Sequence, residues 1–320
     1  MSVEPATLRA LAPAKINLGL FLGPVRESDG RHELVTVMQS ISLADELTLG
    51  PAPAGRVGDE LVCPDLPGPP ERNLAARALR EFRARTGWQA PPLRLTVEKR
   101  IPVAAGLAGG SADAAAALRL ARAASRLGDE QLLLEIAASL GADVPAQVSP
   151  GRWLASGAGE HLERLPAPAV PFGVLVLPAR FELSTAEVYA EADRLGLARE
   201  RADLHRRHEE LASALGRGAP LPAATELLHN DLQRAAVSLR GETAEPLRAL
   251  GRAGAAPALI SGSGPTAVGL FARPREEGVG LARLAAEALG AREPAAVVAV
   301  PVDAEFGEAQ PVARDAAGAL

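Results

Sequence analysis

The sequence is poor in several residue types, and each shortage excludes a class of protein or site. A single cysteine, Cys63, stands among 320 residues, which excludes an internal disulfide and any metal site built from several cysteines. The five histidines form no pattern typical of a metal site. No apolar run reaches the roughly 20 residues that a membrane-spanning helix needs, and the first ten residues lack the features of a secretion signal. The net charge of −5 provides no basic field for nucleic acid or anionic lipid. We therefore expect a cytoplasmic protein that binds neither nucleic acid nor membrane.

Lysine and tyrosine are scarce enough to single out the few that occur. The 34 basic residues include only two lysines, Lys15 and Lys99, and the chain has one tyrosine, Tyr189. A compact ammonium fits where a guanidinium does not, so both lysines are candidates for a functional site. With 48% hydrophobic residues over this length, the chain is expected to form one large domain or two of ordinary size.

The most informative stretch is VEKRIPVAAGLAGGSADAAAALRLA, residues 97–121. It predicts a short strand, a loop rich in glycine and alanine over residues 102–112 (the glycine-alanine loop), and a helix that opens near Ser111. Gly106, Gly109 and Gly110 allow several backbone amides to turn toward one anion, and a helix N-terminus adds free N–H groups. The spacing matches neither a P-loop nor a dinucleotide fingerprint. The loop predicts a phosphate site, with an ordinary strand-to-helix turn as the alternative.

Three other segments could carry chemistry, and each has a plainer interpretation. Alternation over residues 14–20 places Lys15 and Asn17 on one face of a strand, where the alternative is a solvated lysine. Asp143 follows Gly141 at the end of a predicted helix and could act in chemistry or only cap the next helix. The segment SGSGPT, residues 261–266, is a glycine turn between apolar strands, and by itself indicates a hairpin.

Composition predicts two domains of the α/β (α+β) class. A proline-rich stretch at residues 166–171 marks the expected boundary between an N-terminal domain, 1–165, and a C-terminal domain, 166–307. The second half predicts the order β-α-α-β-β-α-β, which is close to a ferredoxin-like layout. Residues 308–320 are expected to form a disordered tail.

Taken in order, seven segments resemble the GHMP kinases, a family of small-molecule kinases. They are APAKINLGL at 12–20, DGRHELVTV at 29–37, KRIPVAAGLAGGSADAA at 99–115, LGADVP at 140–145, SGAGE at 156–160, NDL at 230–232 and SGSGPT at 261–266. The resemblance implies a mixed-sheet α/β domain that binds ATP, a ferredoxin-like C-terminal domain and an active site in the cleft between them. A Rossmann oxidoreductase is disfavoured because the glycine spacing differs.

Within that family the motifs most resemble the branch that phosphorylates the 2-hydroxyl of 4-diphosphocytidyl-2-C-methylerythritol, a cytidine diphosphate derivative on the non-mevalonate route to isoprenoids. The resemblance implies ATP and Mg²⁺ as cofactors, and a monomer or weak homodimer. Two alternatives stay open: another GHMP kinase, of the homoserine or mevalonate type, and a non-catalytic nucleotide sensor with the same fold.

The resemblance also implies roles for individual residues. Asp143 would be the catalytic base, with Lys15 beside it. The nucleotide would contact Lys99, Asn73 and the glycine-alanine loop, namely Pro102, Val103, Ala104, Ala105, Gly106, Leu107, Ala108, Gly109, Gly110, Ser111 and Ala112. The substrate would contact Asn17, Arg31, His32, Thr185 and Tyr189, with Tyr189 stacked on the cytosine and His32 addressing it. No protein residue is predicted as a metal ligand.

This chain departs from the family pattern at several positions. Arg31 stands where the family usually has a tyrosine, and we expect its guanidinium to stack on the base instead. Ala104, Ala105 and Ala108 replace loop glycines, so these positions must adopt negative φ or carry strain. Ala112 replaces a serine and leaves Ser111 as the hydroxyl near phosphate or metal.

Overall fold

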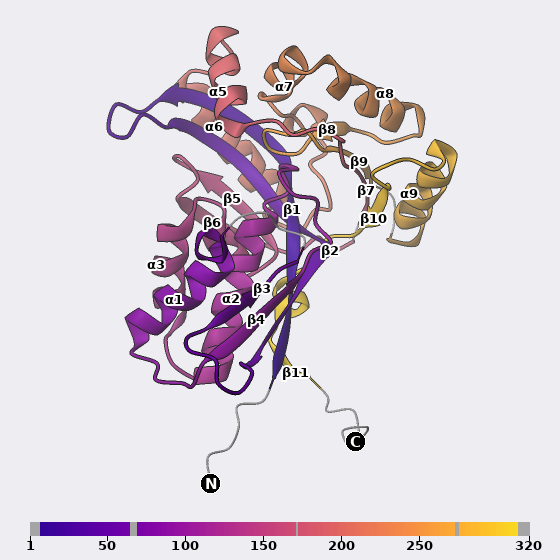
Figure 1. The fold of residues 1–320 in the computed structure, drawn as a ribbon. Coiled ribbons are helices and arrows are strands. Elements are labelled where there is room, and N and C mark those ends of the chain that lie inside the picture. The colour runs from indigo at the N-terminus through magenta and orange to yellow at the C-terminus, as the bar shows by residue number, and fades with distance from the viewer. Residues whose placement is uncertain (1–6, 65–68, 171, 273–274, 313–320) are drawn as a thin grey trace.

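The computed structural model describes residues 7–64, 69–170, 172–272 and 275–312. Two β-sheets organise the chain (Figure 1). The larger sheet has the strand order β11-β1-β2-β4-β3, with β5 and β6 added alongside β2, and the smaller has the order β10-β7-β9-β8. The first sheet is built on β1 (Leu8–Val25), β2 (His32–Pro51), β3 (Glu60–Val62), β4 (Leu93–Glu98), β5 (Arg152–Ser156) and β6 (His161–Leu165).

A long antiparallel hairpin of β1 and β2 forms the centre of the first sheet. Its register shifts at three places, between Pro13 and Lys15, between Asn17 and Gly19, and between Leu22 and Val25. One half of β2 pairs with β4 and the other half with β5, whereas β3 runs parallel to β4. The sheet is therefore mixed, as expected, and the free end of its hairpin lies beside α5 (Thr185–Arg194) and α6 (Arg201–Leu215) (Figure 1).

Helices cover one face of the first sheet and bury the alanine-rich segment. The central helix α2 keeps residues 112–118 fully buried, since alanine side chains let a helix pack closely against strands. Asn73 caps α1 by accepting from the amides of Ala75 and Ala76, and Gly87 ends it in the left-handed conformation. These elements are η1 (Pro70–Arg72), α1 (Leu74–Thr86), α2 (Gly109–Ser125), α3 (Glu130–Leu140) and α4 (Val144–Val148).

The second sheet is antiparallel and has the strand order of a ferredoxin-like fold. Its strands are β7 (Gly173–Leu177), β8 (Ala258–Ile260), β9 (Ala267–Phe271) and β10 (Val297–Ala299). The order β10-β7-β9-β8 confirms the predicted layout. The accompanying helices are α5 (Thr185–Arg194), α6 (Arg201–Leu215), η2 (Thr225–Leu227), α7 (Gln233–Leu239), η3 (Gly241–Thr243), α8 (Ala244–Arg252) and α9 (Arg275–Leu289). Across the described ranges, none of the helices is long and apolar enough to cross a membrane.

The C-terminal segment returns to the first sheet, which corrects one expectation. Beyond β10, Pro301 bridges to Ile41, and η4 (Ala304–Gly307) leads into β11 (Gln310–Pro311), which pairs with Leu8 and Arg9 of β1. Disorder was expected over 308–320. This expectation is wrong for 308–312, because β11 in this segment pairs with the open edge of β1. Residues 313–320 lie outside the described residues. The expected boundary at residue 166 falls between β6 and β7, and the division into domains stays a prediction.

Candidate active site

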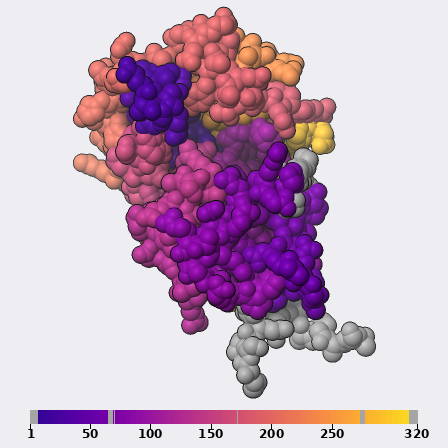
Figure 2. Space-filling model, turned by 60° about the vertical axis from the view of Figure 1, so that its left-hand side comes forward, coloured from indigo at the N-terminus to yellow at the C-terminus, as the bar shows by residue number. Residues whose placement is uncertain are grey.

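A cavity of about 1090 Å³ lies between the hairpin, the glycine-alanine loop and the start of α5. Figure 2 shows the surface hollowed where the indigo hairpin, the purple first-sheet region and the salmon-coloured helices meet. The structure gathers most of the predicted site residues around this central cavity. Those lining it are Lys15, Asn17, Arg31, His32, Lys99, residues 102–111, Asp143, Thr185 and Tyr189. Two predicted residues, Asn73 and Ala112, are not in its lining.

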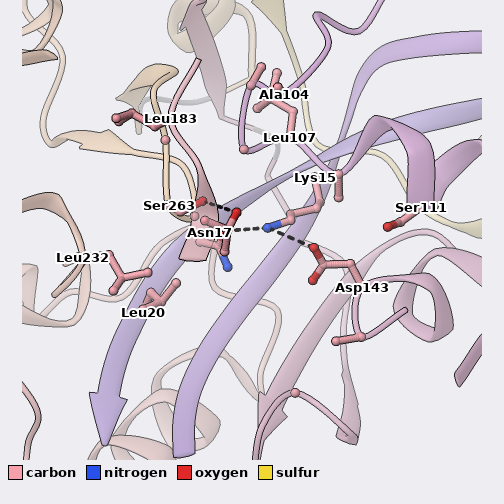
Figure 3. Close-up of a pocket in the computed structure, with 18 of the residues that line it drawn as sticks. Lys15, Asn17, Leu20, Ala104, Leu107, Ser111, Asp143, Leu183, Leu232 and Ser263 are labelled. Atoms are coloured by element: carbon pink, nitrogen blue, oxygen red, sulfur yellow. Dashed lines mark hydrogen bonds and ion pairs between the residues drawn. The ribbon is translucent and has the colours of Figure 1, made fainter. Parts of the chain in front are cut away.

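Lys15 and Asp143 face each other in the middle of the cavity (Figure 3). The Lys15 Nζ lies 3.8 Å from Asp143 Oδ2, and it donates to Asn17 Oδ1 at 2.8 Å. Asn17 in turn donates to Thr36 Oγ1 at 2.7 Å, and Thr36 donates to the Gly19 carbonyl at 2.6 Å. The Lys15 side chain is only 8% exposed, so this chain of hydrogen bonds fixes the direction of its ammonium.

Asp143 does not have the capping role that the sequence left open. It precedes α4, but its side chain makes no cap hydrogen bond and points instead toward Lys15 (Figure 3). The side chain is 42% exposed, and it borders the cavity. A carboxylate held beside an ammonium and open to a ligand can accept a proton from a bound hydroxyl.

The glycine-alanine loop presents an uncapped helix N-terminus to the cavity. Helix α2 begins at Gly109, two residues earlier than predicted, so the last four residues of the loop form its first turn. Ala108 at the N-cap offers no side-chain acceptor, and the first turn contains no acidic residue. Gly109, Gly110 and Ser111 line the cavity there. Free amides and the positive end of the dipole suit an anion at this point.

The alanine substitutions leave two strained positions in this loop. Ala104 has φ 52° and Ala108 has φ 55°, and in the described residues Arg126 is the only other non-glycine residue with positive φ. A left-handed conformation costs an L-residue about 1 kcal/mol. Ala104 and Ala108 therefore each carry a conformational cost that glycine at the same position would avoid. Ala105 is not among these positive-φ positions. Ala112 is buried in α2, and Ser111 supplies the hydroxyl at the cavity wall.

The turn at residues 261–264 (the SGSG turn) joins β8 to β9 of the second sheet and packs against the glycine-alanine loop. A Cβ at Gly106 would lie 2.4 Å from the Ser261 carbonyl oxygen, so only glycine fits there. The Ser261 hydroxyl donates to the Gly106 carbonyl at 3.1 Å. Asn230 holds the turn itself, because its amide donates to the Ile260 and Gly262 carbonyls at 2.8 and 2.7 Å. The NDL motif at residues 230–232 was the only sequence signal for this anchor.

Lys99 lies in a buried triad beneath the loop. Its ammonium donates to Asp113 Oδ2 at 2.7 Å and to Asp45, and Asp45 also accepts from the Ile101 amide at 2.8 Å. Burial raises the pKa of Asp113 to about 7, with the Asp45 charge adding to the rise and Lys99 opposing it. Burial alone would lower the pKa of Lys99, but the two carboxylates raise it above its ordinary value. The structure thus gives Lys99 a bracing contact that the sequence did not predict.

The opposite end of the cavity is aromatic and cationic. The Tyr189 and His32 rings are 5.4 Å apart, and Arg31 donates to the Ala158 carbonyl at 2.6 Å. Burial and the Asp143 charge raise the pKa of Tyr189 to about 12, so its phenol is neutral. Thr185 and Ser263 share a hydrogen bond of 2.9 Å. Flat faces and a fixed guanidinium suit a planar, electron-rich ring.

An uncapped helix end, a lysine–aspartate pair and an aromatic end in one cavity suit a small-molecule kinase. Residues 73–151 match the model of the GHMP kinases N terminal domain. A solved homoserine kinase from Cytophaga hutchinsonii has a TM-score of 0.70 at 16% identity over 97% of this chain and 99% of that one, which shows a shared fold. The chain is therefore an ATP-dependent small-molecule kinase of the GHMP class.

More specific relatives place it within that class. The chain is 43% identical over 267 residues to the 4-diphosphocytidyl-2-C-methyl-D-erythritol kinase of Pelotomaculum thermopropionicum, covering 83% of this chain and 89% of that one. It is 40% identical to the enzyme of that name in Anaeromyxobacter dehalogenans, covering 92% and 89%. A solved 4-(cytidine 5'-diphospho)-2C-methyl-D-erythritol kinase has a TM-score of 0.70 at 34% identity, covering 91% and 98%. The chain belongs to the family of 4-diphosphocytidyl-2-C-methyl-D-erythritol kinases.

Proposed function

We propose that this chain transfers the γ-phosphate of ATP to the 2-hydroxyl of 4-diphosphocytidyl-2-C-methyl-D-erythritol, a step of the non-mevalonate route to isoprenoid precursors. The observation that carries the proposal is the Lys15–Asp143 pair, which lies in one cavity with an anion-binding helix end and a ring-binding end. The names of the relatives supply the identity of the substrate.

Asp143 and Lys15 divide the chemistry between them. Asp143 accepts the proton of the substrate hydroxyl while that oxygen forms its bond to the γ-phosphorus and the bond to the departing ADP oxygen breaks. Lys15 keeps Asp143 oriented and stabilises the negative charge on the transferring group. Asn17 holds the ammonium in place from the side remote from Asp143 (Figure 3). Positioning and charge neutralisation account for most of the catalysis in phosphoryl transfer.

The glycine-alanine loop has the donors that a triphosphate needs. The first amides of α2 are uncapped, and Gly106, Gly109 and Gly110 place no side chain in the way. Among the described residues no group of three or more His, Cys, Asp or Glu could hold a metal ion. Mg²⁺ would then be held chiefly by phosphate oxygens and water, as is usual for this ion, with the Ser111 hydroxyl as its protein neighbour. When bound it neutralises phosphate charge.

The remaining contacts follow from the lining of the cavity. Tyr189 and Arg31 would hold the cytosine between a ring and a guanidinium, with Thr185 and His32 beside them. Lys99 would act on the nucleotide mainly through the loop that it braces, and Asn73 through the start of α1. A cytoplasmic location and a monomer or weak homodimer complete the proposal.

Substrate comparison tests this assignment against the other GHMP kinases. ATP consumption should be measured with 4-diphosphocytidyl-2-C-methyl-D-erythritol, homoserine and mevalonate in parallel. Turnover confined to the cytidine substrate is the expected result, and turnover of another alcohol alone would contradict the proposal. A sensor would bind ATP without consuming it in any of the three reactions.

Replacing the proposed base separates catalysis from binding. Asp143→Asn should lower kcat by about 10³-fold, since general base catalysis contributes roughly 10² to 10⁴, while the Kd for ATP changes less than about threefold. Stopped assays and calorimetry measure the two quantities. The matched control is Asp303→Asn, a carboxylate outside the cavity lining, which should behave as wild type. Substantial residual turnover in Asp143→Asn would remove the residue from its role.

A further inference from the structure

His32 has an oxygen neighbour at each of its two ring nitrogens. Nδ1 lies 2.8 Å from the Gly23 carbonyl oxygen, which can only accept. Nε2 lies 3.1 Å from Asp193 Oδ1, and a carboxylate can only accept as well. The Asp193 side chain is 52% exposed and the His32 side chain 7%, so the carboxylate stays solvated while the ring is enclosed. His32 therefore lies between the Gly23 carbonyl of the hairpin and Asp193 of α5.

Asp193 belongs to a stripe of α5 that faces the cavity. Thr185, Tyr189 and Asp193 are spaced four residues apart, so they lie on one side of the helix. Thr185 contacts Ser263, the Tyr189 ring lies 5.4 Å from the His32 ring, and Asp193 pairs with the same histidine. His32 is therefore contacted by two successive residues of the stripe, at its face by Tyr189 and at its edge by Asp193.

Apolar packing holds the neighbouring side of α5, and Tyr189 packs against the same cluster. Val188 and Ala192 are fully buried in a cluster with Leu20, Leu22 and Leu232. Contacts of this kind depend on buried area and are not directional. Polar contacts between two particular atoms are directional. Two of them flank Tyr189 along the stripe, each four residues away: Thr185 with Ser263, and Asp193 with His32.

We propose that Asp193 is a positioning residue for the base-binding end of the cavity: by pairing with His32 it fixes the rotation of α5 and thereby places the Tyr189 ring. This inference rests on the proposed function, because it assigns Tyr189 to a pyrimidine. Asp193 itself is not in the lining of the cavity, so it acts through His32 and Tyr189 and does not touch the substrate.

Steady-state kinetics test the proposal, because it predicts a change in KM for the cytidine substrate and not in kcat or in KM for ATP. Asp193→Ala should raise KM for the cytidine substrate about tenfold, which corresponds to about 1.4 kcal/mol, while kcat and KM for ATP stay within about twofold. Asp193→Asn keeps an oxygen acceptor for Nε2 and should recover part of the loss. The control is Glu187→Ala, which removes an acidic side chain from the opposite side of the same helix and should leave all three parameters unchanged.

The single tyrosine gives a second readout that needs no turnover. Fluorotyrosine labelling reports on Tyr189 alone, and its resonance should move in Asp193→Ala but not in Glu187→Ala. Calorimetry with cytidine diphosphate as the probe should show the same tenfold weakening. Thermal unfolding of each variant identifies any loss that comes from a damaged fold, and Asp193→Asn then serves as the milder variant.

The outcomes separate this inference from the proposed function. If wild type does not phosphorylate the cytidine substrate, the proposed function fails, and an unmoved Tyr189 resonance would independently overturn the role of Asp193. If wild type is active but Asp193→Ala has an unchanged KM for that substrate, the inference alone is wrong. An equal loss in kcat and in KM for ATP would also overturn it, because a positioning role at the base end predicts neither.

Discussion

The two lysines differ in the carboxylates that they contact. Lys15 pairs with one half-exposed aspartate and a neutral amide, so its charge is available to a ligand in the cavity. Lys99 is enclosed by two buried aspartates, so its charge is neutralised by carboxylates of the protein. Both lysines line the cavity, but the Lys15 ammonium is the less neutralised by protein carboxylates and is therefore the better placed to stabilise a transferring phosphate.

At this residue scale the Lys99 triad predicts a dependence of stability on pH. The pKa of Asp113 is about 7 in the folded protein and near 4 in an unfolded chain, so the folded state binds more protons between those values. Its contribution to the free energy of unfolding is therefore present below about pH 4 and is lost as pH rises toward 7. Urea unfolding at several pH values measures it.

The isosteric variant isolates that contribution from the other titrating groups. Asp113→Asn cannot ionise, so its free energy of unfolding should fall less than that of wild type between pH 4 and 7. The difference is on the order of 1 to 4 kcal/mol, taking about 1.4 kcal/mol for each unit of pKa. Parallel pH profiles for the two proteins would contradict the raised pKa.

Arg31 gives a second prediction at the same scale. Its guanidinium is held by the Ala158 carbonyl and borders the cavity with Tyr189. Arg31→Ala should raise KM for the cytidine substrate about tenfold, in line with the roughly 1 to 2 kcal/mol of a desolvated cation–π contact, and change KM for ATP much less. Arg56→Ala, far along the chain and exposed, is the control. Equal KM values for wild type and Arg31→Ala would dispose of the stacking role.

At the scale of elements, the loop and the SGSG turn behave as one unit. Gly106→Ala would place a Cβ 2.4 Å from the Ser261 carbonyl oxygen at a φ of +73°, so the loop must shift. We expect kcat/KM for ATP to fall at least about tenfold, since small displacements of positioning groups are costly in catalysis. Gly251→Ala is the control, because nothing lies within 4 Å of its added Cβ. Unchanged kinetics in Gly106→Ala would show that the loop is not held as described.

Sequence reasoning predicted elements well where the signal is local. The alternation around Lys15 predicted a strand, the alanine-rich run predicted α2, and the order of segments in the second half predicted the β10-β7-β9-β8 sheet. The start of α2 was misplaced by two residues, because a left-handed alanine at the N-cap breaks the usual preference. No local pattern encodes that conformation.

The functional pairings that were missed all join distant parts of the chain. Lys99 meets Asp45 across 54 positions, and Asn230 meets the SGSG turn across about 30. His32 meets Asp193 from another sheet and helix. Composition singled out the lysines, but only the folded chain decides which carboxylate each one reaches.

At the scale of the whole molecule, β11 pairs with the start of β1 at the edge of the first sheet, at the opposite end of β1 from the hairpin loop that borders the cavity (Figure 1). Ending the chain after Glu308 removes β11 and should lower the free energy of unfolding by about 1 kcal/mol, the size of a few cross-strand contacts. The kinetic parameters should not change, since β11 borders no part of the cavity. Ending the chain after Val312 is the matched control. An equal stability for both truncations would contradict the role of β11.

The close approach of Gly106 to the SGSG turn has a consequence for engineering. The glycine-alanine loop and a turn encoded some 155 residues later are two halves of one interface, which has no room for a Cβ at Gly106. A chimera that exchanges the loop with that of another family member must therefore carry the matching turn and its Asn230 anchor. Exchanging the N-terminal half alone would place the new loop against the original SGSG turn, at the point where the two are in closest contact.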